Sequence, residues 1–168
     1  MDFKGYINES SINTLYQSAV DAFPNTRMRQ HATAPIEIRN VNITPYAGVR
    51  TLFVRADARN EDRHYAPMIL FRGVNYNADG PIQIEYQGRL YTFEAPSLAR
   101  TDVHIRCNCN DFKWRFNYYD HLDHSLYGRV RAPYENQGGA PANPQEMPGM
   151  CKHLMKLAQV LEEEGLII

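Results

Sequence analysis

The chain has 168 residues, with a hydrophobic fraction of 43% and a charged fraction of 22%, values that are ordinary for a soluble globular protein. Its formal net charge of −1 excludes a general electrostatic attraction to nucleic acid or to an anionic membrane. No apolar run approaches the ~20 residues that a membrane-spanning helix needs, so the sequence predicts no membrane partner.

The cysteine content bears on the compartment. There are three cysteines, an odd number, and Met1 to Gly5 lacks the basic and apolar segments of a secretory signal. Disulfide frameworks belong to secreted proteins and need paired cysteines. The sequence therefore predicts an intracellular, reducing compartment.

The first element expected is a helix. Ser10 or Ser11 can cap it, and Pro24 and Asn25 end it after Phe23. Its apolar residues share one helical face, at Ile12, Leu15, Tyr16, Ala19, Val20 and Phe23. This pattern predicts an amphipathic helix that packs on a sheet rather than one that binds a partner.

From about Pro35 the pattern becomes that of β-strands. Apolar residues alternate or form short runs that turn residues separate. The expected strands are 36–43, 49–56, 67–74, 82–86, 90–93 and 103–107. Residues 82–93 read as a hairpin around Gln87 and Gly88. Strands and helices do not alternate as they do in βαβ units, so the sequence predicts an α+β fold. Residues 1–102 should form an antiparallel β-rich domain or small barrel, with the N-terminal helix packed on it.

All three cysteines lie in two short signatures. Cys107 and Cys109 end the last strand, and Cys151 and His153 begin a helical pattern. Three thiolates and one imidazole form the ligand set of a closed tetrahedral Zn²⁺ site. The sequence therefore predicts a structural zinc centre with these four ligands.

The spacing of the ligands constrains their local structure. Residues i and i+2 of a strand point to the same side, so Cys107 and Cys109 can converge on one ion. In a helix the same two positions diverge by about 200°. Cys151 must therefore lie just before the first helical turn, with His153 inside it. Arg106 and Lys152 flank the ligands and could offset the negative charge of a zinc–thiolate centre.

The rest of the C-terminal part is expected to form a zinc module over 103–168 with a long insert at 110–150. Residues 134–149 are rich in Gly, Pro, Asn and Gln, which predicts an irregular loop. The final helix has an apolar face at Leu154, Leu157, Ala158 and Leu161. Gly165 can cap its end, with Leu166 making the contact that follows such a cap.

The most aromatic stretch of the chain runs from Asp111 to Tyr119. Phe112, Trp114 and Phe116 alternate with Lys113 and Arg115, which predicts a half-buried strand. The alternative is a contact surface for nucleic acid or another partner, formed by Lys113, Trp114 and Arg115, because rings stack on bases and cations bind phosphates. Core packing is the favoured interpretation, since the chain carries no excess of positive charge.

Other interpretations of the thiols and imidazoles remain open. One cysteine could act with His153 as a nucleophile, although the other two cysteines would then have no role. The thiols could also be inert and buried. His121 and His124 could bind a second metal ion or replace a ligand, but surface positions in the insert are the simpler expectation.

The pattern Cys107-x-Cys109, an insert, then Cys151-x-His153 at the start of a helix resembles the SWIM-type zinc module. The resemblance covers about residues 103–161, and the insert is longer than is usual there. It implies a strand-strand-helix arrangement around zinc, and binding of DNA or protein.

Several short segments of the chain are also similar in sequence to small SWIM-containing virion proteins of tailed bacteriophages. The segments that carry this similarity are 23–26, 44–46, 111–116 and 148–153. It implies a virion component. The function predicted is a non-enzymatic, zinc-stabilised assembly protein that contacts other proteins, and the alternative is a nucleic-acid-binding zinc-finger protein.

Overall fold

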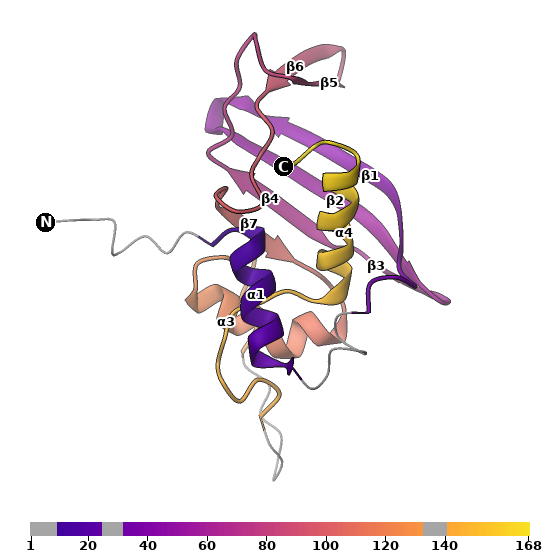
Figure 1. Ribbon diagram of the computed structural model, residues 1–168, viewed down its shortest axis with the longest axis vertical. Helices are drawn as coiled ribbons and strands as arrows, with labels where there is room; N and C mark the ends of the chain where they lie inside the picture. Colours follow the sequence, from indigo (N-terminus) through magenta and orange to yellow (C-terminus); the bar gives the residue numbers. More distant parts are fainter. Residues whose placement is uncertain (1–9, 25–31, 133–140) are drawn as a thin grey trace, which may run out of the picture.

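The computed structural model describes residues 10–24, 32–132 and 141–168 (Figure 1). The chain start at residues 1–5 and the first half of the predicted loop 134–149 lie outside these ranges. Helix α1 (Ile12–Ala22) begins at Ser11, whose side-chain oxygen accepts the N–H of Thr14, and ends at Phe23. The predicted amphipathic helix is confirmed, with Ile12, Leu15, Ala19 and Ala22 buried on one face.

Five strands form the main antiparallel sheet. They are β1 (Glu37–Tyr46), β2 (Thr51–Asn60), β3 (Arg63–Tyr65), β4 (Met68–Arg72) and β7 (Val103–Arg106). Their order is β1-β2-β4-β7, and the short β3 pairs with the end of β2. The sequence pattern missed β3, because Asp62 and Arg63 look like loop residues and three residues are too few to show a period. The α+β class with antiparallel strands is confirmed.

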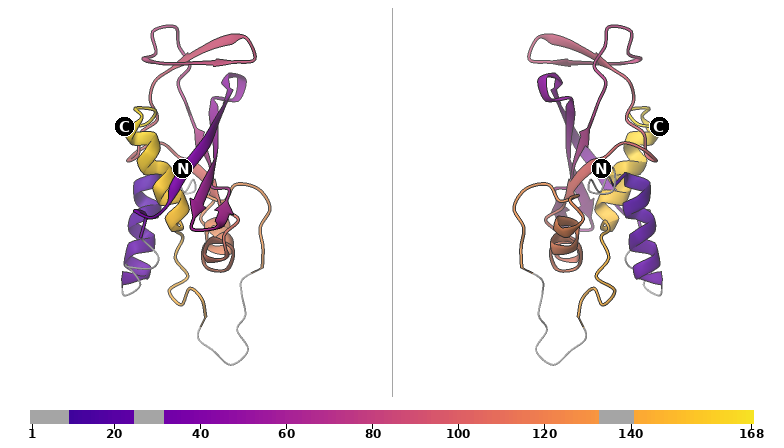
Figure 2. Two further views of the ribbon diagram at one scale, coloured as in Figure 1. Left: turned by 90° about the vertical axis from the view of Figure 1, so that its right-hand side faces the viewer. Right: turned by 90° about the vertical axis from the view of Figure 1, so that its left-hand side faces the viewer.

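Strands β5 (Ile82–Tyr86) and β6 (Arg89–Phe93) form a separate hairpin, as predicted. Its two turn residues, Gln87 and Gly88, both have positive φ, at 51° and 77°. This is the backbone of a type I′ turn, whose twist matches that of the flanking strands. The hairpin lies at one end of the molecule, beyond the main sheet (Figures 1 and 2).

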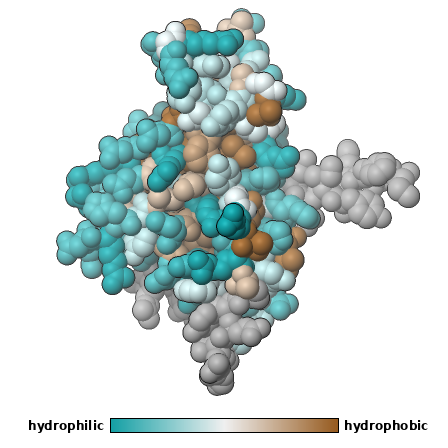
Figure 3. Space-filling model, turned by 180° about the vertical axis from the view of Figure 1, so that it is seen from behind, coloured by the Kyte–Doolittle hydropathy of each residue, from teal (hydrophilic) through white to brown (hydrophobic). Residues whose placement is uncertain are grey.

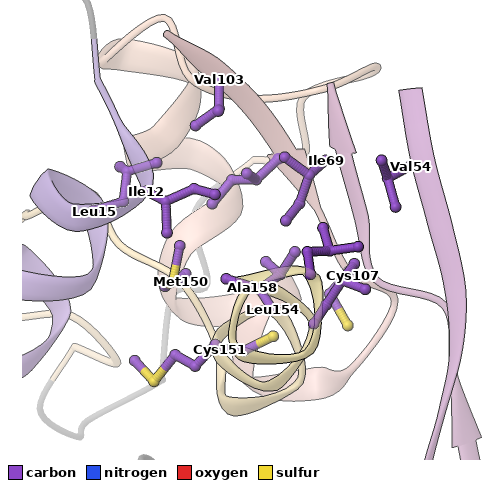
Figure 4. Packing of buried hydrophobic residues seen from close by; sticks show 14 of the residues in the cluster. Ile12, Leu15, Val54, Ile69, Val103, Cys107, Met150, Cys151, Leu154 and Ala158 are labelled. Atoms are coloured by element: carbon purple, nitrogen blue, oxygen red, sulfur yellow. The ribbon is translucent and has the colours of Figure 1, made fainter. Parts of the chain in front are cut away.

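Helices α1 and α4 (Lys152–Glu163) lie on the same side of the main sheet (Figure 2). Alternate residues of the strands, such as Leu52, Val54 and Ile69, point toward them and are fully buried. Leu157 of α4 belongs to the same cluster, as does Leu154, which Figure 4 labels. The cluster takes residues from both sides of position 102; the proposed division into domains 1–102 and 103–168 stays a prediction.

The prediction for the aromatic stretch was wrong. Residues Phe112–Phe116 form a π-helical turn that continues into α3 (Asn117–Leu122), not a half-buried strand. Phe112 and Phe116 are both buried, and two apolar residues four apart suit a helical turn as well as a strand. The strand-strand-helix arrangement that the SWIM resemblance implies needs a second strand after β7. In the described part of 103–151 no such strand is present, and Ile105 and Leu126 form only an isolated β-bridge.

Candidate metal centre

The four predicted ligands come together. Cys107 and Cys109 directly follow β7, and Cys151 and His153 stand at the start of α4. Their ligand atoms all lie within 4.8 Å of one another, and each residue is at most 3% exposed. Figure 4 shows Cys107 and Cys151 next to buried side chains of α4 such as Leu154. Among the described residues this is the one group of three or more such side chains that could hold a metal ion.

The start of α4 has the geometry that the spacing requires. Cys151 is the N-cap residue, with extended backbone angles (φ −80°, ψ 169°), and His153 lies in the first turn. The divergence of about 200° expected inside a regular helix is thereby avoided. The prediction that the helix begins after Cys151 is confirmed.

The donor set fits a tetrahedral ion. The Sγ of Cys107 and the Nδ1 of His153 are 3.9 Å apart. Bond lengths of about 2.3 Å to sulfur and about 2.0 Å to nitrogen at a tetrahedral angle place two such atoms about 3.6 Å apart. The group could therefore hold a metal ion, and zinc is typical of three thiolates with one imidazole.

The charge balance of the thiols also calls for a cation. Burial raises the pKa of the Cys107 and Cys151 thiols well above the usual value. Hydrogen bonds from these two thiols, with further help from the N–H of Phe112, lower the pKa of Cys109. The Phe112 N–H lies 3.3 Å from the Cys109 Sγ. In a buried site, three thiolates need a divalent ion to hold them all ionised.

The surroundings of the ligands hold contacts that the sequence pattern did not reveal. The ring of Tyr65 covers that of His153, with centroids 4.3 Å apart. The His153 Nε2 is buried and has no hydrogen-bond partner among the described residues. Arg106, expected to offset thiolate charge, donates instead to the carbonyls of Tyr127 and Arg129, at 3.1 and 2.8 Å.

The segment that leads to Cys151 is held at several points. The Asn143 amide donates to the carbonyls of Arg115 and Met147, at 2.9 and 2.8 Å, although the segment has no regular secondary structure. The Ser18 hydroxyl of α1 donates to the Pro148 carbonyl at 2.5 Å. The irregular loop predicted for 134–149 is thus confirmed over 141–149, but it is anchored to the fold by polar contacts.

Asp120 of α3 supplies the last of these anchors. Its Oδ1 accepts the N–H of Gly149 at 2.8 Å, while its Oδ2 is buried without a partner among the described residues. The side chain is 0% exposed, and burial raises its pKa well above the ordinary value. The approach to the second ligand pair therefore rests on a carboxyl group that favours its neutral form.

Replacement of Asp120 by Asn tests this protonation state. Because the folded pKa lies above the unfolded one, the folded state holds the proton more tightly, and wild-type stability falls as pH rises from about 4 toward the folded pKa. Asp120→Asn has no such proton. The difference between the two free energies of unfolding, wild type minus Asp120→Asn, should therefore decrease as pH rises, by at most ~1.4 kcal/mol per pH unit.

The measurement is urea unfolding of both proteins, loaded with zinc, from pH 5 to pH 8. The subtraction removes the pH dependence of the metal site, which both proteins share. Glu163→Gln, at an exposed carboxylate, serves as control and should give a flat difference. A flat difference for Asp120→Asn as well would show that Asp120 is ionised in the fold.

The other residues named from the sequence lie apart from the ligand group. Lys113, Trp114 and Arg115 are half-buried on the π-helical turn. The Lys113 Nζ lies 5.3 Å from the centre of the Trp114 ring, and the Arg131 guanidinium lies 5.2 Å from it. Arg115 pairs with Asp111 at 2.9 Å and lies over the ring of Phe23.

His121 and His124 do not join the ligand group. Both are exposed, and with Arg72, His104 and Leu126 they line a cavity of about 280 Å³. Burial, with Arg72 next to it, lowers the pKa of His104. Neither His121 nor His124 belongs to the group of potential metal ligands found among the described residues.

No family model matches the chain, and neither a curated protein nor a solved structure matches it. The resemblance to the SWIM module therefore rests on the ligand pattern and on the buried cluster that these ligands form. Within the described ranges, no helix is both long and apolar enough to cross a membrane.

Proposed function

We propose that this chain is a non-enzymatic, zinc-stabilised assembly protein that works by contacting other proteins. The observation that carries the proposal is the closed ligand group: four buried protein donors lie within 4.8 Å of one another. A catalytic zinc site has three protein ligands and leaves a position for water or substrate. Four protein donors leave none, which supports a structural role for the ion.

The position of the ligands supports the same role. A metal ion there would join the end of β7 to the start of α4, and so tie the sheet to one of the helices that cover it. The anchors at Asn143, Pro148 and Gly149 add to this joint. A rigid body of this kind suits a component that presents surfaces to partners. The tailed-phage virion is the assembly that the sequence resemblance implies.

The test uses the native protein, isolated from the cells that make it or from particles that contain it. The chain should elute in a complex larger than its own 19.4 kDa, with a fixed ratio to at least one other protein. Recovery as a free monomer under native salt would overturn the assembly role.

The alternative is a nucleic-acid-binding protein, and one observation favours it. Trp114 is half-buried with Lys113 and Arg131 close to its ring, an arrangement that could add a stacked base and phosphate contacts. Against it stand the net charge of −1 and the pairing of Arg115 with Asp111. Cations already paired in the fold contribute less to phosphate binding.

Trp114→Ala separates the two functions. We expect it to lower the free energy of unfolding by about 1–3 kcal/mol, because a half-buried ring and its cation contacts are lost. Binding to a single-stranded oligonucleotide should be weak for both proteins. Fluorescence anisotropy with labelled oligo-dT, at two salt concentrations, measures it.

Lys156→Ala on α4 is the matched control and should change neither quantity. Micromolar binding by wild type with a steep salt slope, reduced by Trp114→Ala but not by Lys156→Ala, would establish the alternative function.

A further inference from the structure

The main sheet has a second face, which points away from α1 and α4. The strand register places its side chains in three rows across the sheet. The rows are Tyr46, Thr51 and Arg72; then Thr44, Phe53, Leu70 and His104; then Asn42, Arg55, Met68 and Arg106. Figure 3 shows this face, with apolar side chains in the middle and hydrophilic ones around them.

The centre of the face is apolar and only partly covered. Phe53, Leu70 and Met68 occupy neighbouring positions on β2 and β4, and all three are half-buried. Phe53 stacks on Tyr127, with ring centroids 5.1 Å apart and planes 27° apart. Helices α1 and α4 cover the opposite face of the sheet (Figure 2). On this face, His121 and His124 line a cavity with Arg72 and His104, and Tyr127 covers part of Phe53.

Arginines outnumber carboxylates on the face. Beyond the three rows it also holds Glu37 and Asp57, which are close to Arg39 and His64. Arg55, Arg72 and Arg106 stand around the apolar centre, and none of the three rows contains a carboxylate. Two of the three are already engaged: Arg72 pairs with Asp102 at 2.9 Å, and Arg106 donates to backbone carbonyls. Arg55 is exposed next to Met68. An apolar centre with arginines around it is the composition of interface hot spots.

The size of the patch indicates the shape of its partner. Four strands at ~4.8 Å spacing span about 14 Å, and three rows along the strands span about the same distance. A helix with its side chains is ~10 Å wide, so one helix fits across the patch. Packing of a helix on the exposed apolar face of a sheet is the common way to bury such a face.

We propose that this face docks an acidic amphipathic helix of a partner protein, with an apolar stripe over Phe53, Leu70 and Met68 and carboxylates beside Arg55 and Arg72. This inference rests on the proposed assembly function and names the surface that serves it. A second copy of the chain is disfavoured, because an isologous contact would set arginines against arginines. Nucleic acid is disfavoured, because the centre of the face is aliphatic apart from Phe53, whose ring is already stacked on Tyr127.

The test uses the full-length, zinc-loaded chain and two synthetic peptides. One is an amphipathic helix of leucine and glutamate, and the other has lysine at every glutamate position. Titration into ¹⁵N-labelled protein should shift the amides of residues 51–55 and 68–72 with the acidic peptide and not with the basic one. Arg55→Glu should weaken binding of the acidic peptide at least tenfold.

Arg63→Glu is the matched control, because Arg63 is an exposed arginine of the same sheet whose position alternates to the other face. It should bind like wild type. Leu70→Gln, checked for folding and zinc content, should weaken binding without changing the charge. Shifts confined to another surface, or equal binding of both peptides, would overturn the inference, as would shifts of these amides by oligo-dT alone.

The inference and the proposed function can fail separately. If the native chain is found in an assembly and Arg55→Glu does not weaken it, this face is not the docking surface while the assembly role stands. If the native chain is a monomer, the assembly role fails.

Discussion

Cys109→Ser should abolish stoichiometric metal binding and unfold the junction between β7 and α4. Cys109 is 3% exposed and is one of the four buried donors that could hold the ion, so its loss leaves the site with three. Structural zinc sites contribute about 10–16 kcal/mol of apparent binding free energy in zinc-finger peptides. A loss of even about 5 kcal/mol would lower the melting temperature by roughly 10–20 °C for a chain of this size.

The measurements are zinc per chain by elemental analysis and thermal unfolding by circular dichroism. Wild type should carry one zinc per chain when it is purified without chelator. Asn110→Ser is the control, since this exposed neighbour of Cys109 is not among the potential ligands, and it should keep both the zinc and the melting temperature. Full zinc content in Cys109→Ser would contradict the assignment of this ligand.

Chelators should act more readily on the wild-type protein as pH falls. The thiols must lose their protons to bind the ion, so protons compete with the metal at every ligand. Burial, which raises the pKa of Cys107 and Cys151, makes this competition stronger. Zinc release to a fixed excess of chelator, followed between pH 8 and pH 5.5, measures it. Release that is independent of pH would argue against thiolate ligands.

Gly149→Ala should destabilise the protein by about 1–3 kcal/mol or more, as overpacking of a filled core does. A Cβ at this position would lie 2.6 Å from Cε1 of Phe116 and 2.9 Å from Cβ of Ala19. Both neighbours are buried, and Phe116 is in edge contact with Phe23, so the ring has little room to move. The substitution forces α1, the π-helical turn and the segment before Cys151 apart.

Urea unfolding of the zinc-loaded variants measures this effect. Gly48→Ala is the matched control: a Cβ there meets nothing within 4 Å, and the backbone does not have positive φ. Its stability should stay within about 0.5 kcal/mol of wild type. If Gly149→Ala is equally silent, the close packing of residue 149 against Phe116 is not present in solution.

The ligand set could be predicted because its chemistry is local in the sequence. Cys107 and Cys109, and Cys151 and His153, are each two residues apart, and three thiols with one imidazole suggest one ion before any fold is known. The restriction on Cys151 followed from helix geometry alone. Helix α1, α4 and the β5–β6 hairpin also followed from period and turn residues, which are properties of neighbouring positions.

The aromatic stretch shows where such reasoning stops. The alternation of Phe112, Trp114 and Phe116 fits a strand, but the chain turns directly after Cys109, where the Phe112 N–H binds the Cys109 sulfur and the Lys113 N–H binds the Cys109 carbonyl. These bonds start a helical turn because the sulfur is held at the ligand cluster. The local pattern contained no sign of that constraint.

The sequence by itself predicted the four residues that could hold a metal ion, the class of fold and most of the strands, since each ligand pair and each strand is a pattern of neighbouring residues. Only the tertiary structure decided what holds the second ligand pair: Gly149 and Asp120 are far apart in sequence, as are Ser18 and Pro148, and no period relates them. It also decided which sheet face stays open. Leu52 and Phe53 are adjacent apolar residues of β2 that point to opposite faces of the sheet. Helices α1 and α4 pack on the face of Leu52 only, so Leu52 is buried and Phe53 stays half-exposed.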